Sequence, residues 1–279
     1  MRRPRSSPPT PPTEHPNVVH IIVDDLRLSL LNTDFDKNNT SFKIHTPNID
    51  QLAKHGVTYS RAYAQQALCN PSRASFMTGR NPDNTTVWNL DENWRVKHQD
   101  WTSLPGMFKD SGIYKSLGSG KTYHDTVQNG IEDAIFEYDS HRSWSPESLP
   151  YRNPCWTQGI DCAGCPGDGG RWKINNVSAN FCVHTVGDLA DVLTTNHAID
   201  LLDNVIVPTM NEDKEGEQPF YLAVGYHKPH MPWIAKQEFF DLYPLEDIPL
   251  PKVQSLPDGI PFIAYNDNSM VSFRSVVVW

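Results

Sequence analysis

Short apolar runs that read as strands alternate with amphipathic segments that read as helices. The run NVVHIIVDDLR, residues 17–27, is apolar and β-branched, which predicts a buried parallel strand. PFYLAVGYH, residues 219–227, predicts a second buried strand. VTYSRAYA (57–64) and IYKSLGSGK (113–121) predict two more, the latter leading into a loop.

Helix signals occur between these runs. TPNIDQLAKHG, residues 46–56, has a threonine N-cap, a proline in the first turn and a glycine stop. Further helices are predicted from just after Cys69 to Gly79, over 103–112 and over 186–206, whereas residues 125–182 are expected to be irregular. Alternating strands and helices predict an α/β fold with a mainly parallel sheet.

Composition narrows the class of protein. The chain has 279 residues and a net charge of -9, with acidic and basic residues mixed along it. We expect no nucleic-acid partner, since there is no basic footprint, and no membrane partner, since no apolar run approaches spanning length. The proline-rich leader 1–16 lacks the apolar core of a secretory signal peptide, so we expect it to be disordered.

Four of the five cysteines cluster late in the chain, at Cys155, Cys162, Cys165 and Cys182. The C-x-x-C spacing allows a four-thiolate zinc site, whereas the Gly/Pro-rich surroundings suit one or two disulfides that pin a long loop. We favour disulfides, because no histidine pair completes a zinc pattern. Cys69 is then the thiol left over.

Reactive side chains follow several predicted strands. Asp24–Asp25, Lys121–His124 and His227 each come just after one, and Cys69 begins a helix after another. Ligands of parallel sheets bind beyond the carboxyl ends of the strands. The sequence therefore predicts one site at that edge.

Each group also has a plainer interpretation. Asp24 and Asp25 suit Ca²⁺ or Mg²⁺, or they are a helix cap or solvated acids. GSGKT lacks the earlier glycine of a nucleotide-binding P-loop, so Lys121 and His124 instead suit anion binding and proton transfer, or ordinary surface roles.

The segments around His227 and Cys69 also leave alternatives open. In HKPHMP, His227, Lys228 and His230 suit zinc, an oxyanion or a structural role. A helix N-terminus and Arg73 both favour the thiolate form of Cys69, as a nucleophile, a modified residue or a metal ligand. A positive pocket beside a cation site indicates an anionic substrate, a sulfate or phosphate ester.

One segment resembles a known signature. Cys69-Asn70-Pro71-Ser72-Arg73, followed by Thr78-Gly79-Arg80, matches all fixed positions of the sulfatase motif C-x-P-S-R-x-x-x-x-T-G-R. The stretches VDDLR, GSGKTYH, FYLAVGYHKPHMPW and LYPLEDIPLP support the likeness. The resemblance implies an alkaline-phosphatase-like α/β fold, and oxidation of Cys69 to formylglycine by the formylglycine-generating enzyme.

The resemblance also implies roles for the site residues. Asp24 and Asp25 are similar to calcium ligands, and Cys69 would supply a further oxygen as the formylglycine hydrate, which Arg73 would stabilise. In the implied reaction one hydroxyl of the hydrate attacks sulfur, the alcohol leaves, and removal of the proton from the second hydroxyl expels sulfate.

The remaining positions carry over in the same way. Lys121 would bind the sulfate, and His124 would take the proton from the second hydroxyl. His227 would bind sulfate and assist the leaving group, and His230 would face the substrate. The implied substrate is a sulfated uronic acid or glycosaminoglycan-like sugar.

The likeness covers residues 17–265, interpreted as the N-terminal part of a catalytic domain, and 266–279 form an unmatched tail. The family completes its metal site with an Asp-His-Gly or Asp-Asn-Gly segment and a further lysine, and we find no such segment in 231–279. The alternatives are a phosphate or phosphonate ester hydrolase, or an inactive truncated fragment.

Family resemblance implies a secreted or lysosomal protein. That location is compatible with the four N-x-S/T glycosylation acceptors, at Asn38, Asn39, Asn84 and Asn176.

Overall fold

The computed structural model of the chain describes residues 15–26, 44–124, 134–146, 172–174, 177–179, 181–183, 189–207, 218–230, 233–248 and 259. The chain divides into two compact units. Unit 1 comprises Met1–Ile22, Gln65–Arg152 and Thr194–Tyr226, and unit 2 comprises Val23–Ala64, Asn153–Leu193 and His227–Trp279.

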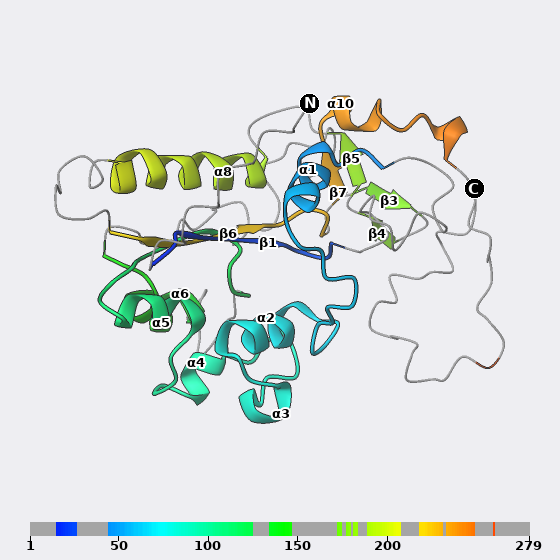
Figure 1. Cartoon of the computed structure of the whole chain (residues 1–279). Helices are drawn as coiled ribbons and strands as arrows, with labels where there is room; N and C mark the ends of the chain where they lie inside the picture. The colour runs from blue at the N-terminus through cyan, green and yellow to red at the C-terminus, as the bar shows by residue number, and fades with distance from the viewer. Residues whose placement is uncertain are drawn as a thin grey trace, which may run out of the picture. The chain divides into compact units, whose positions relative to one another are not determined.

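A sheet with helices on both faces organises unit 1. In the described residues the strand order is β1-β6-β2, and α8 lies on one face while α2, α5 and α6 lie on the other (Figure 1). The elements are β1 (Val18–Val23), α2 (Cys69–Thr78), α3 (Pro82–Thr85), α4 (Trp94–Lys97), α5 (Leu104–Asp110), β2 (Lys115–Gly120), α6 (Ala134–Ser143), α8 (Ala190–Leu201), the π-helical turn η3 (Leu202–Ile206) and β6 (Phe220–Tyr226). Helix α8 begins in unit 2 and β1 ends there.

The central strand β6 is buried on both faces, because its alternating side chains enter two different cores. Tyr221 and Ala223 join a cluster with Ala74, Met77, Val87, Trp94 and Trp144. Phe220, Leu222 and Val224 join a cluster with Leu117, Ala198, Leu201 and Ile206. The pairing of β6 with β2 is parallel, from Lys115↔Phe220 to Gly120↔Gly225.

Unit 2 contains shorter elements. They are α1 (Pro47–His55), β3 (Trp172–Ile174), β4 (Val177–Ala179), β5 (Phe181–Val183), β7 (Trp233–Ala235), α10 (Gln237–Phe240) and the 3₁₀ turn η4 (Leu245–Asp247). β3 pairs antiparallel with β4, and β5 pairs parallel with β7. The backbone N–H of His45 donates to the Tyr243 hydroxyl at 2.7 Å, which fastens the approach to α1 to the segment after α10.

Several predicted elements are confirmed with their boundaries. Helix α1 follows Thr46 and ends before Gly56, and α2 begins at Cys69 and ends before Gly79. Ser103 caps α5, since its hydroxyl oxygen accepts from the Gly106 N–H at 3.0 Å. The strands β2 and β6 are also where the sequence predicts them, and the 186–206 segment forms α8 and η3.

Three expectations are wrong in part. VTYSRAYA (57–64) forms no strand and exposes Val57, Tyr59 and Tyr63, because alternation alone supplies no partner for the backbone groups. β1 forms, but Val19 and Ile21 are each 53% exposed, because burial depends on neighbours in the fold that the apolar run does not specify. The region 125–182 is not uniformly irregular, since it contains α6, β3, β4 and part of β5.

Some expectations fall outside the described residues. These are the leader up to residue 14, the tail 266–279, and the side chains of Cys155, Cys162, Cys165, Asn38, Asn39 and Asn176. Cys182 lies in β5, of which only the backbone is described. Among the described residues, no helix has the length and apolar character that crossing a membrane requires.

The two-sided burial of β6 generates a stability prediction. Leu222 is 1% exposed, so Leu222→Ala leaves a cavity and is expected to lower the free energy of unfolding by about 2–5 kcal/mol. Leu90→Ala is the matched control in the same unit, because Leu90 is 41% exposed and its truncation should change stability by less than about 0.5 kcal/mol. Denaturant unfolding measures both, and equal losses would contradict the two-sided core.

Candidate active site

Cys69 lies at the start of α2 in unit 1, where the sequence predicts it. It is the first residue of the helix and is half-buried. The amide of neighbouring Asn70 donates to the carbonyl oxygens of Asn89 and Glu92, at 2.9 and 2.6 Å. Pro71 follows within the first helical turn, where a backbone N–H has no intrahelical acceptor to lose. The helix therefore begins at Cys69, and the Asn70 hydrogen bonds anchor its first turn.

Lys121 brings a positive charge to this thiol. Its Nζ lies 4.0 Å from Cys69 Sγ, and the lysine is 9% exposed. Lys121 directly follows β2, and its N–H donates to the Gly225 carbonyl at 2.8 Å. A buried ammonium interacts more strongly with an anion than a solvated one does, because the effective dielectric constant is lower. The structure thus joins two predicted site residues, Cys69 and Lys121.

Two glycines allow this close approach. A Cβ on Gly225 would lie 1.8 Å from the Lys121 carbonyl oxygen, and a Cβ on Gly120 would lie 2.3 Å from that of Gly225. Gly120 also has a φ of +69°, which favours glycine. The chain can therefore turn directly from β2 into Lys121 only because both positions lack a side chain.

Arg73 ties α2 to the same segment. It is buried, and its guanidinium donates to the carbonyl oxygens of Lys121 and Thr122, at 2.5 and 3.1 Å. Arg73 lies one turn along the helix from Cys69, so it fixes where the thiol and the lysine lie relative to each other. This contact is with the backbone of the loop, and it adds a positioning role to the one expected from the sequence.

Tyr123, which the sequence analysis did not single out, anchors the loop that carries Lys121 and His124. Its ring lies near those of Trp94 and Trp144, with centroid distances of 6.0 and 6.4 Å. Burial raises the pKa of Tyr123 well above its ordinary value, so the phenol stays neutral. His124 follows directly and is partly buried. No spacing rule marks Tyr123, because its contacts come from distant segments.

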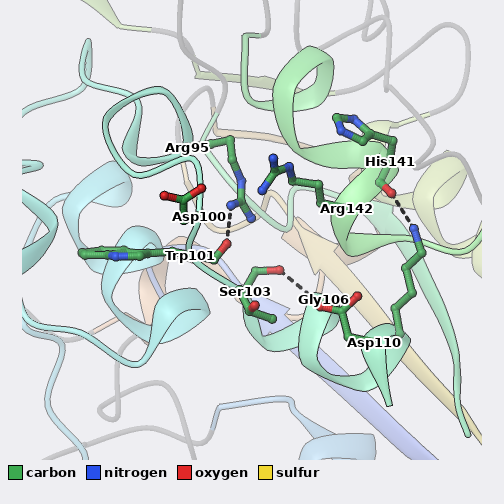
Figure 2. A pocket seen from close by; sticks show the side chains of 10 residues that line it. Arg95, Asp100, Trp101, Ser103, Gly106, Asp110, His141 and Arg142 are labelled. Carbon is green, nitrogen blue, oxygen red and sulfur yellow. Dashed lines mark hydrogen bonds between the residues drawn. The ribbon is translucent and has the colours of Figure 1, made fainter. Parts of the chain in front are cut away.

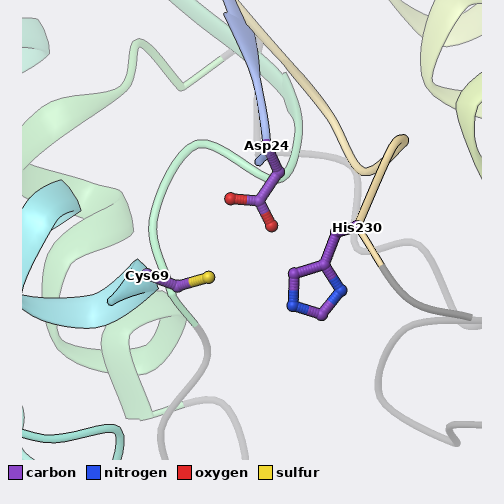
Figure 3. A group of neighbouring side chains, drawn as sticks. All are labelled: Asp24, Cys69 and His230. Atoms are coloured by element: carbon purple, nitrogen blue, oxygen red, sulfur yellow. The ribbon is translucent and has the colours of Figure 1, made fainter. Parts of the chain in front are cut away.

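In unit 2 the two predicted acids meet an imidazole. Asp24 is 6% exposed, and a carboxylate oxygen lies within 4.8 Å of a His230 ring nitrogen; Figure 3 shows the two side chains facing each other, and also draws Cys69 of unit 1. Asp25 Oδ2 lies 4.0 Å from His230 Nε2. Asp25 has a φ of 59°, a conformation that is uncommon outside glycine and more accessible to aspartate than to most residues. The strand therefore ends where both acids lie near one histidine.

His227 and His230 form a compact turn after β6. Their ring centroids lie 4.7 Å apart, and the His230 N–H donates to the His227 carbonyl at 3.0 Å. His227 is buried. Asp191 accepts from the backbone N–H groups of His227 and Lys228, at 2.7 and 2.9 Å. Asp191 was not predictable as a site residue, since nothing in its local sequence pattern marks it.

The donors in unit 2 fit a hard cation. A carboxylate that is 6% exposed requires a compensating positive group, and a second carboxylate follows directly. Calcium prefers such oxygen ligands, although it takes about six to eight of them. Two carboxylates therefore suit part of a calcium site.

A separate pocket of about 280 Å³ lies in unit 1 among Arg95, Asp100, Lys109, Asp110, His141 and Arg142 (Figure 2). The guanidinium of Arg95 already pairs with buried Asp139 at 2.6 Å. Lys109 and Arg142 donate to the carbonyl oxygens of His141 and Gln99. None of the predicted site residues lines this pocket, and its Arg and Lys side chains are already engaged by Asp139 and by backbone carbonyls, so we assign it no anion-binding role.

Comparison with known proteins identifies the chain's relatives. A family model described as "Sulfatase" matches residues 16–274. Human iduronate 2-sulfatase is 39% identical over 255 residues, which is 91% of this chain and 42% of that protein. The chain therefore spans about two fifths of the length of that relative.

Solved structures share the fold. The phosphonate monoester hydrolase of Agrobacterium radiobacter aligns with a TM-score of 0.54 at 19% identity, covering 84% of this chain and 45% of that one. A protein solved with its substrate D-glucosamine-2-N,6-O-disulfate aligns with a TM-score of 0.52 at 16% identity, covering 86% and 40%. These likenesses confirm the predicted alkaline-phosphatase-like α/β fold. Given the family model that matches most of its length, the chain belongs to the sulfatase family.

Proposed function

We propose that this chain carries the nucleophile and sulfate-binding part of a sulfatase that hydrolyses sulfate esters of uronic acids or related glycosaminoglycan-like sugars. One observation carries the proposal: the buried Lys121 ammonium lies 4.0 Å from Cys69 Sγ. Cys69 is the first residue of a segment that matches the complete sulfatase signature. A nucleophile beside a desolvated cation suits attack on an anionic ester.

Calcium is the metal that this proposal requires. Asp24 and Asp25 would hold it, and oxidised Cys69 would supply a further ligand oxygen. Bound there, the ion would supply positive charge that stabilises the oxygens of the sulfate. Ligands beyond these three would have to come from elsewhere in the protein.

Cys69 would act as formylglycine, produced by the formylglycine-generating enzyme. Its hydrate would supply one hydroxyl to attack sulfur and a second whose deprotonation releases sulfate. Lys121 would bind sulfate oxygens next to residue 69. Arg73, which donates to the Lys121 carbonyl, would hold Lys121 in place relative to α2. His124, three residues after Lys121, would accept the proton of the second hydroxyl.

The turn that contains His227 and His230 would act on the leaving group of the ester. His227 would bind the sulfate and donate a proton to the leaving alcohol, and His230 would contact the sugar. The sugar class rests on the name of the 39%-identical relative, iduronate 2-sulfatase, and on the sulfated glucosamine bound by the more distant fold neighbour.

We also propose that the protein is secreted or lysosomal and carries N-linked glycans. Of the four predicted glycosylation sites, Asn84 lies among the described residues. It is exposed in α3, so a glycan attached there would extend into solvent. One other function has physical support: a phosphate or phosphonate ester hydrolase, because the phosphonate monoester hydrolase shares the fold.

The nucleophile is tested by co-expression with the formylglycine-generating enzyme. Peptide mass spectrometry should find an aldehyde in place of the Cys69 thiol. Cys69→Ala should then lower aryl sulfate turnover on the order of 10³-fold or more, because the attacking group is gone. The exposed Ser111→Ala in the same unit is the control and should retain turnover. An unmodified Cys69 after co-expression would contradict the proposal.

The metal site predicts a calcium-dependent stability. A cation that binds only the folded state stabilises that state by about 2.7 kcal/mol when its free concentration is about 100 times its Kd. Ca²⁺ should therefore raise the Tm of the wild type. Asp24→Asn should abolish that rise, since it removes a charged ligand. Asp247→Asn makes the same charge change at an exposed position of unit 2 and should retain it. A full calcium shift in Asp24→Asn would show that the ion binds elsewhere.

Ester preference separates the two hydrolase functions. A phosphate monoester carries up to two negative charges near pH 7, and a sulfate ester carries one, so a site fitted to a singly charged sulfate leaves the second charge of the phosphate without a compensating group. We expect kcat/KM for an aryl sulfate to exceed that for the matching aryl phosphate by at least about tenfold. An aryl phosphonate monoester, which also carries one charge, is the third substrate. Faster turnover of the phosphonate would favour the alternative function.

A further inference from the structure

Asp191 joins the start of α8 to the segment that follows β6. Both of its carboxylate oxygens are engaged: Oδ1 accepts from the His227 N–H at 2.7 Å, and Oδ2 accepts from the Lys228 N–H at 2.9 Å. All three residues belong to unit 2. Hydrogen bonds from backbone N–H groups to an ionised carboxylate are stronger than bonds between neutral groups. One side chain therefore holds two consecutive peptide groups.

The segment held in this way is short and tied to itself. The His230 N–H donates to the His227 carbonyl at 3.0 Å, and Lys228 Nζ donates to the His230 carbonyl at 3.2 Å. A displacement of the peptide groups at His227 and Lys228 is therefore passed on to His230. The His227 and His230 rings, whose centroids lie 4.7 Å apart, would move with the backbone that carries them.

The position of these rings matters because of what lies beside them. His230 Nε2 is 4.0 Å from Asp25 Oδ2, and a His230 ring nitrogen lies within 4.8 Å of a carboxylate oxygen of Asp24. Proton transfer and anion binding both depend on hydrogen-bond reach, which a shift of about 1 Å can remove. We infer that Asp191 is a positioning residue, which sets the places of His227 and His230 by clamping the backbone between them.

A simpler role for Asp191 is to stabilise its own helix. An acidic residue in the first turn of a helix interacts favourably with the helix dipole. That role requires a negative charge near the helix start but no contact with another segment. The two bonds to His227 and Lys228 go beyond it, and they predict effects at the histidines that loss of a helix-dipole interaction would not produce.

The test uses Asp191→Asn in the full chain. The amide keeps the shape of the side chain but has one acceptor oxygen, so its NH₂ group must face one of the two backbone N–H donors. We expect amide hydrogen exchange at His227 and Lys228 to accelerate about tenfold or more relative to the β6 amides, as opening of the turn becomes easier. The ring signals of His227 and His230 should shift in NMR spectra.

Asp203→Asn is the matched control. Asp203 is exposed in the turn η3 that continues α8, so this change removes the same charge without touching the histidine turn. Exchange rates and ring signals should match the wild type. If Asp191→Asn does not fold, Asp191→Glu replaces it, because the longer side chain displaces both acceptors but retains the charge. Unchanged exchange at His227 and Lys228 in the folded variant would overturn the inference.

The consequence for catalysis rests on the proposed sulfatase function. In modified, calcium-loaded protein, Asp191→Asn should lower kcat for an aryl sulfate about tenfold with a smaller change in KM, because the groups that assist the leaving alcohol are displaced. A general loss of stability would lower the Tm, but it would not lower kcat selectively relative to KM. Faster exchange with unchanged ring signals and unchanged kcat would overturn the positioning role.

The two failures are distinguishable. If the wild type turns over no sulfate ester, the proposed function fails, but exchange and ring signals still decide whether Asp191 positions the histidines. In that case inorganic sulfate serves as the probe. Sulfate should perturb the His227 ring signals in the wild type and in Asp203→Asn, and less in Asp191→Asn. Equal perturbation in all three proteins would count against Asp191.

Discussion

The parallel pairing of β6 with β2 is the constraint on which the arrangement around Cys69 depends. At the end of that pairing the Lys121 N–H donates to the Gly225 carbonyl at 2.8 Å, and the absence of a Cβ at Gly225 makes room for the Lys121 carbonyl. That carbonyl in turn accepts from Arg73 at 2.5 Å, which fastens α2 and its first residue, Cys69. A lysine, an arginine and a thiol from two segments are thereby located by one strand pair. The register of the sheet therefore determines where the Lys121 ammonium lies relative to the Cys69 thiol.

The sequence predicted what local signals encode. β6 was recognisable as an apolar run, and α2 from its proline and glycine. The exposed face of β1 and the missing strand at 57–64 were not predictable, because burial and pairing depend on neighbours that a pattern does not name. The acids, Lys121, His124 and the histidines were predicted as site residues because they follow strands or match a motif, and they stay predictions. Asp191 was not, since its partners lie 36 and 37 residues away and no motif links them.

The two groups of residues have complementary chemistry. The group in unit 1 offers a thiol beside a buried ammonium, which suits a nucleophile that attacks an anion. The group in unit 2 offers two carboxylates near an imidazole, which suits a cation and a proton donor. A sulfate ester needs both, because its oxygens require positive charge and its leaving alcohol requires a proton. We propose that both groups serve one reaction because the chain belongs to the sulfatase family.

The central claim, that a sulfatase reaction uses both groups of residues, is tested most directly by the reactivity of Cys69 in the unmodified protein. The rate of alkylation at Cys69 is measured by peptide mass spectrometry with and without Ca²⁺, in the wild type and in Asp24→Asn. The account predicts that Ca²⁺ changes the Cys69 rate severalfold in the wild type and leaves it unchanged in Asp24→Asn. An identical Cys69 rate with and without Ca²⁺, in wild-type protein whose Tm shows that calcium is bound, would contradict it.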